Sequence, residues 1–225
     1  MVTPVRIMVE RGKKKRVVAC AFDWPGWDRS AKTEDEALAV LESYRPRFAP
    51  VAGLAGLGDE FAEAGRFEVV ERLPGIGTTD FYGLSGVPAA AEHDAMSAAA
   101  CERKIAILRA TWAYCDAAAS RVSAELRKGP RGGGRERDEI YRHVNGWEIY
   151  DLAKKVGVQW PVETREDPSA LAAYREAFVD AIRERCARGE AMARTWTLQF
   201  LIRRCAWHQL DHAWEMEDRD LGGTS

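Results

Sequence analysis

The chain has 225 residues, of which 46% are hydrophobic and 30% charged, with a formal net charge of −2. This composition is typical of a soluble globular protein, and the charge excludes a strongly basic nucleic-acid binder. No segment reaches the roughly 20 consecutive apolar residues of a membrane-spanning helix. The N-terminal charges follow the apolar residues, which is the reverse of the order in a signal peptide. We therefore expect a cytoplasmic protein that contacts no membrane.

The first 75 residues predict a small unit of strands around one helix. Residues 5–12 and 17–24 predict a β-hairpin, and the basic run between them, RGKKKR, is interpreted as its solvated turn and not as a nucleic-acid patch. Residues 23–31 are expected to form a turn-rich loop. A helix should begin at Thr33, which has Glu36 at the capping-box spacing, and end at Pro46.

After a Gly/Ala-rich loop, residues 66–73 predict a third strand, so the unit has the order β-β-α-β. The Gly/Ala/Pro-rich segment that follows predicts a linker. The sequence thus divides into a small αβ domain at 1–75, the linker at 76–91 and a helical domain at 92–225.

Four helices are expected in the helical domain. One glycine-rich break, at 128–136, separates the first from the second, and Asp167 with Pro168 predicts the start of the third. Four amphipathic helices after a small αβ unit predict an α+β chain with a C-terminal four-helix bundle. The expected ranges are about 94–127, 136–156, 168–188 and 190–219.

The histidines carry the strongest chemical signal. The chain has four, and His208 and His212 lie four residues apart in the last predicted helix, so both imidazoles can face one point. His143, in the second helix, is the natural third ligand, because a bundle brings helices together. Imidazole is a common ligand of divalent metals, and three protein ligands are usual for a catalytic zinc site. The alternative is that the histidines are ordinary half-buried residues bonded to carboxylates such as Asp211 or Glu215.

Neighbouring residues narrow the possible chemistry. Gln209 stands where an H-E-x-x-H metalloprotease has its glutamate base, which disfavours peptide hydrolysis by that mechanism. Cys205 is a soft ligand, a redox-sensitive neighbour of the site or, as we expect, a small buried hydrophobe. Glu148 and Asp151 follow His143, but their pattern assigns neither a catalytic role. The five cysteines are dispersed without a C-x-x-C pair, which predicts reduced thiols: Cys20, Cys101, Cys115, Cys186 and Cys205.

The helical part resembles the DinB/YfiT-like family of metal-dependent four-helix proteins. The matching segments are YRHVNGWEIYDLAKKVG, with His143, and IRRCAWHQLDHAWEMEDR, with His208 and His212. The resemblance implies a three-histidine site for a divalent metal, and zinc or nickel is the expected ion. It also implies a thiol-dependent S-transferase or isomerase that uses a low-molecular-weight thiol and a small-molecule substrate. A non-enzymatic metal-binding regulatory or interaction protein is the alternative.

The N-terminal part resembles the small HicB-like domain of antitoxins. The resemblance rests on Pro25 and Gly26 after a strand and on the T-x-x-E-A-L segment from Thr33 to Leu38. The sequence has no segment for DNA binding of the kind such antitoxins add, so nucleic acid is not an expected partner. A lid or dimerisation module is the expected role, with an exposed strand edge that pairs with a second copy in a homodimer.

Overall fold

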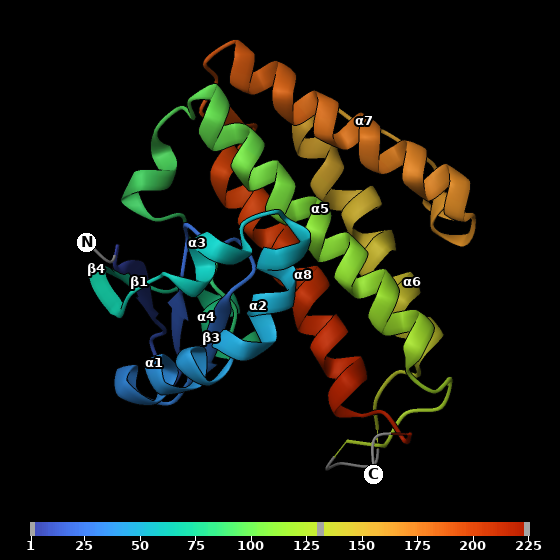
Figure 1. The fold of residues 1–225 in the computed structure, drawn as a ribbon, viewed down its shortest axis with the longest axis horizontal. Coiled ribbons are helices and arrows are strands. Elements are labelled where there is room, and N and C mark those ends of the chain that lie inside the picture. Colours follow the sequence, from blue (N-terminus) through green and yellow to red (C-terminus); the bar gives the residue numbers. More distant parts are fainter. Residues whose placement is uncertain (1–2, 130–132, 223–225) are drawn as a thin grey trace.

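The computed structural model describes residues 3–129 and 133–222, and it has the mixed α+β character that the sequence predicts. A four-stranded sheet with short helices packs beside a group of longer helices, α5 to α8 (Figure 1). Within the described residues, no helix is both long enough and apolar enough to span a membrane.

The sheet has the strand order β3-β2-β1-β4. The predicted hairpin is confirmed, since β1 and β2 pair antiparallel, and so is the third predicted strand, β4, which lies parallel to β1. The prediction of a loop at 23–31 is wrong in part, because the second half of that segment is a strand. The predicted order β-β-α-β therefore lacks one strand before the helix. The strands are β1 Val5–Arg11, β2 Val17–Cys20, β3 Asp28–Ala31 and β4 Phe67–Pro74.

Tertiary contacts explain why β3 was missed. Its sequence, DRSA, has no alternation of apolar and polar residues and no β-branched residue. The strand is held by its ladder with β2 and by Asp28, which is buried and accepts a hydrogen bond from Arg203 at 3.1 Å. A partner so distant in sequence cannot be predicted from the local pattern.

Helices cover one face of the sheet. The start predicted at Thr33 is confirmed, because its hydroxyl accepts from the backbone N–H of Glu36 at 3.2 Å. The end predicted at Pro46 is wrong, because this proline lies in the first turn of the next helix. Backbone N–H groups in a first turn have no partner within the helix, so the N–H that proline lacks is not needed there. The helices are α1 Glu34–Ser43, α2 Arg45–Leu54 and α3 Gly58–Ala62.

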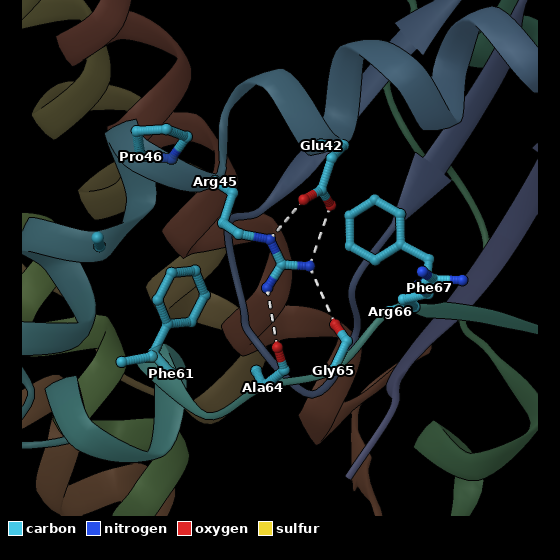
Figure 2. Close-up of a pocket in the computed structure, with 10 residues that line it drawn as sticks. Glu42, Arg45, Pro46, Phe61, Ala64, Gly65, Arg66 and Phe67 are labelled. Atoms are coloured by element: carbon cyan, nitrogen blue, oxygen red, sulfur yellow. Dashed lines mark hydrogen bonds and ion pairs between the residues drawn. The ribbon is translucent and has the colours of Figure 1, made fainter. Parts of the chain in front are cut away.

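Arg45 holds the loop between α3 and β4 in place. Its guanidinium donates to Glu42 at 2.7 and 3.0 Å and to the carbonyls of Ala64 and Gly65 at 3.4 and 3.1 Å (Figure 2). The group lies against a surface hollow of about 810 Å³. Because its donors bind the chain itself, the arginine fixes this corner of the fold and is committed to that role.

The segment expected to be a linker, 76–91, contains short helices and packs on the sheet. Its anchor is Glu10, a buried carboxylate of β1 that accepts from the Ser85 hydroxyl and the Gly86 backbone N–H, at 2.8 and 2.9 Å, and from the Thr79 hydroxyl. The helices are α4 Gly77–Tyr82 and the 3₁₀ turn η1 Ala90–His93.

The long helices follow the predicted order, with shorter bounds at several ends. The predicted cap of the third helix is confirmed, since Asp167 accepts from the N–H groups of Ser169 and Ala170. The fourth helix begins later than predicted, because residues 192–197 form a small hairpin. The elements are α5 Ala98–Arg121, α6 Arg137–Trp147, the π-helical turn η2 Glu148–Leu152, the 3₁₀ turns η3 Ala153–Val156 and η4 Val162–Glu166, α7 Pro168–Ala187, β5 Met192–Ala193, β6 Trp196–Thr197 and α8 Leu198–Asp218.

The predicted glycine-rich break at 128–136 is only partly visible, since residues 130–132 lie outside the described residues. On either side of that gap, α5 ends at Arg121 and α6 begins at Arg137, as a break between two helices requires.

Candidate metal centre

Helix α8 presents the histidine pair on one of its faces. Thr197 caps the start of the helix, because its hydroxyl accepts from the backbone N–H of Phe200 at 3.1 Å. This cap sets the start of the helix, and the spacing of four residues then stacks His208 and His212 one turn apart. Their ring centroids are 4.8 Å apart.

The third predicted histidine lies beside this pair. Helix α6 packs against α8, and the ring centroid of His143 is 5.2 Å from that of His208 and 5.1 Å from that of His212. One ring nitrogen from each histidine lies within 4.8 Å of the other two. The structure therefore brings together the three residues that the sequence singled out, from two helices that have residues 148–197 between them in the chain.

The donor set suits a divalent metal such as zinc or nickel. Three imidazole nitrogens are ligands that both ions accept. Ligands at about 2.1 Å from one ion stand at most about 4.2 Å apart, so a small movement of the rings would close the group around an ion. Nδ1 of His208 is buried and has no hydrogen-bond partner within residues 3–129 and 133–222, so no protein contact of that atom competes with coordination by the ring.

The surroundings keep two of the histidines neutral. Burial and the nearby His212 lower the pKa of His143 to about 4. Burial lowers the pKa of His208 well below its usual value, and the charges of His212 and Arg204 act in the same direction. Only a neutral imidazole can coordinate a metal, so both groups are in the ligand-competent form at neutral pH.

A carboxylate orients the remaining histidine. Nδ1 of His212 lies 2.8 Å from a carboxylate oxygen of Glu215, whose other oxygen accepts from Arg219 at 2.6 Å. With the proton of the ring on Nδ1, the lone pair of Nε2 is free for a metal. Carboxylate–histidine pairs of this kind fix the tautomer and ring orientation of metal ligands. The sequence alternative of a histidine bonded to Glu215 therefore holds for His212, and the bond leaves the other ring nitrogen available.

Aromatic rings lie beside the histidines. The ring centroid of Trp147 is 4.6 Å from that of His208, and Trp207 stacks at 6.2 Å. The guanidinium of Arg204 lies over Trp207 at 4.6 Å and over Trp147 at 5.8 Å. These groups exclude water from one side of His208, which explains its burial.

Other residues considered from the sequence lie away from the three nitrogens. Cys205 is fully buried in the apolar core of α5 to α8 and behaves as a small hydrophobe. Asp211 pairs with Arg29 of β3 at 2.9 Å. Asp151 pairs with Lys155 at 3.6 Å.

Glu148 belongs to a buried polar network in the core of the long helices. Its carboxylate accepts from the indole of Trp112 at 3.0 Å and from the amide of Gln209 at 3.3 Å. Asn145 accepts from Arg175 at 3.3 Å and lies 3.5 Å from Gln209. The network was not predicted, because the π-helical turn that begins at Glu148 changes the direction of the side chains that follow α6.

No family model, curated protein or solved structure matches the chain. The resemblance to DinB/YfiT-like proteins therefore stays an expectation from the sequence, based on the order and spacing of the histidines within their helices.

Proposed function

We propose that the chain is a metal-dependent enzyme of the DinB/YfiT-like type, in which His143, His208 and His212 hold one divalent metal ion. The observation that carries the proposal is the convergence of three ring nitrogens, from α6 and α8, within 4.8 Å of one another. Zinc or nickel is the expected ion, and a thiol-dependent S-transferase or isomerase is the expected class of activity.

The chemistry of the donor set favours a thiol as nucleophile. A divalent ion bound by three neutral imidazoles keeps its full charge and lowers the pKa of a bound thiol or water. Both carboxylate oxygens of Glu215 are engaged, one by His212 and one by Arg219. Glu215 is thus a positioning residue for His212 and is poorly placed to act as a general base. A nucleophile that ionises without a base fits this arrangement.

The first test is the metal content of the purified protein. We expect about one equivalent of divalent metal per chain in the wild type, and a loss of most of it in His143→Ala and His208→Ala, because two imidazoles are a weak site. His93→Ala is the matched control, since His93 is the fourth histidine and lies exposed on η1. Circular dichroism checks that each variant is folded. Equal metal content in His208→Ala and His93→Ala would refute the site.

The second test separates an enzyme from a structural metal protein. Cobalt replaces the native metal, and low-molecular-weight thiols are titrated while the visible and near-ultraviolet spectrum is recorded. A thiolate-to-cobalt band that grows with thiol concentration supports the transferase class. A spectrum that no thiol changes favours the non-enzymatic alternative, in which the metal is structural and the N-terminal unit binds a partner or a second copy.

A further inference from the structure

Helices α5 and α7 pack antiparallel, and two ion pairs fix their register. Arg183 donates to Glu102 at 2.7 and 2.9 Å, and Arg109 pairs with Glu176 through a two-point contact. The two pairs are seven residues apart on each helix, from 102 to 109 on α5 and from 183 down to 176 on α7, as antiparallel helices require. This register brings the first turn of α5 beside the last turn of α7 (Figure 1).

A cysteine lies on each helix at this meeting point. Cys101 comes one residue before Glu102, and Cys186 comes three residues, nearly one turn, after Arg183. Cys101 is buried and Cys186 half-buried, and both pack against the same apolar cluster. The two thiols are close enough to interact directly, and each shifts the pKa of the other. Neither residue belongs to the histidine site.

We propose that Cys101 and Cys186 form a reversible disulfide that staples the start of α5 to the end of α7 when the protein meets a hydroperoxide. Cys186, the less buried of the two residues, reacts first: its sulfur takes the terminal oxygen of the peroxide, the O–O bond breaks, and the alcohol or water leaves. The thiol of Cys101 then attacks the sulfenic acid, and a water leaves. Two thiols and one hydroperoxide thus give one disulfide, one alcohol and one water, and the two electrons pass from sulfur to the peroxide.

The environment sets the rate of this reaction. Burial raises the pKa of both thiols, so little thiolate exists at neutral pH. Oxidation is therefore slow at pH 7 and faster at pH 9, which distinguishes this pair from a highly reactive peroxide sensor. Once formed, the crosslink joins two segments 85 positions apart, from 101 to 186. It removes conformational freedom mainly from the unfolded chain.

The experiment counts free thiols in the full-length protein. Reduced protein is incubated with hydrogen peroxide at pH 7 and pH 9, then denatured, alkylated and weighed by intact mass spectrometry. We expect five alkylated thiols before oxidation and three after it, with restoration to five by a phosphine reductant. Peptide mapping without reduction should recover Cys101 joined to Cys186. The oxidised protein should melt roughly 5–10 °C higher than the reduced protein.

Two variants make the test specific. Cys186→Ser should keep all of its remaining thiols under the same treatment. Cys115→Ser should still lose two, because Cys115 lies in a different cluster, with Val144 and Met216. Diamide, which oxidises thiol pairs without a sulfenic acid, provides a second route to the same bond. If the wild type keeps five thiols with both oxidants, or if the recovered crosslink joins other cysteines, the proposal is wrong.

Discussion

Lys104 is an ammonium group enclosed by the protein. Its side chain lies between α5 and the loop after β2, and its Nζ donates to the carbonyl oxygen of Phe22 at 3.0 Å. Burial lowers the pKa of Lys104 to about 8 from the usual 10.5, although the charge of Glu92 acts in the opposite direction. The folded protein therefore holds this proton less tightly than the unfolded chain does.

This difference predicts how stability depends on pH. Between pH 8 and 10.5 the unfolded chain keeps the proton that the folded protein has lost, so the contribution of Lys104 to the free energy of unfolding rises with pH across this window. The change is on the order of 3 kcal/mol. The variant Lys104→Met has no ammonium group at this position and therefore lacks this pH-dependent contribution. Relative to Lys104→Met, the wild type should gain stability from pH 7.5 to pH 10, as measured by urea unfolding.

Titration of other groups changes both proteins alike, so the difference between the two curves isolates Lys104. Parallel curves over the whole range would contradict a lowered pKa for this group. The second expectation is that Lys104→Met is at least as stable as the wild type at pH 7, because it removes a buried charge.

At the scale of one element, α8 connects the parts of the chain. One face carries His208 and His212, another carries Gln209 into the core of the long helices, and a third carries Arg203 toward the sheet. Arg203 is fully buried, and it donates to Glu92 of η1 at 2.9 and 3.0 Å and to Asp28 of β3 at 3.1 Å. One side chain of α8 thus neutralises two buried carboxylates.

Replacement of Arg203 by Met should be strongly destabilising. The change leaves Glu92 and Asp28 buried without their cation, and such a loss costs about 3–5 kcal/mol. Adding Glu92→Gln and Asp28→Asn to Arg203→Met should recover part of this loss, because the buried charges are then gone. Chemical unfolding of the single and triple variants measures both values. A single variant within about 0.5 kcal/mol of the wild type would show that the network contributes little.

The elements also show what a sequence can predict. The starts at Thr33 and Asp167 were predicted because a cap and its partners lie within three residues of each other. The short polar strand β3 was missed, and α2 and α3 were taken for a loop, because their stability comes from contacts with distant residues and not from a local pattern.

The candidate site also has features that the sequence predicted and one that it did not. Histidine scarcity, the spacing of His208 and His212 and the family resemblance together predicted which three side chains converge. The support of His212 by Glu215 follows from helix spacing. The inward direction of Glu148 depends on a π-helical turn, and no pattern in the sequence signals that turn.

At the scale of the whole molecule, the two parts of the chain share an apolar core. Ile107 of α5 and Leu210 and Trp214 of α8 belong to the same buried cluster as Trp27 and Phe48 of the N-terminal unit. The division into 1–75, 76–91 and 92–225 stays a prediction, and this shared cluster provides its test. Each large apolar side chain that loses its burial costs about 1.5–3 kcal/mol.

We therefore predict that a fragment of residues 92–225 is helical but less stable than the whole chain. Removal of the N-terminal unit uncovers Ile107, Leu210 and Trp214 and takes Asp28 away from Arg203, so the fragment should unfold at a clearly lower urea concentration. The whole chain should unfold in one transition, with the same midpoint by tryptophan fluorescence and by far-ultraviolet circular dichroism. Two separate transitions in the whole chain, one of which has the midpoint of the fragment, would instead show two domains that fold independently. In that case the shared cluster would be a docking surface between domains and not a single core.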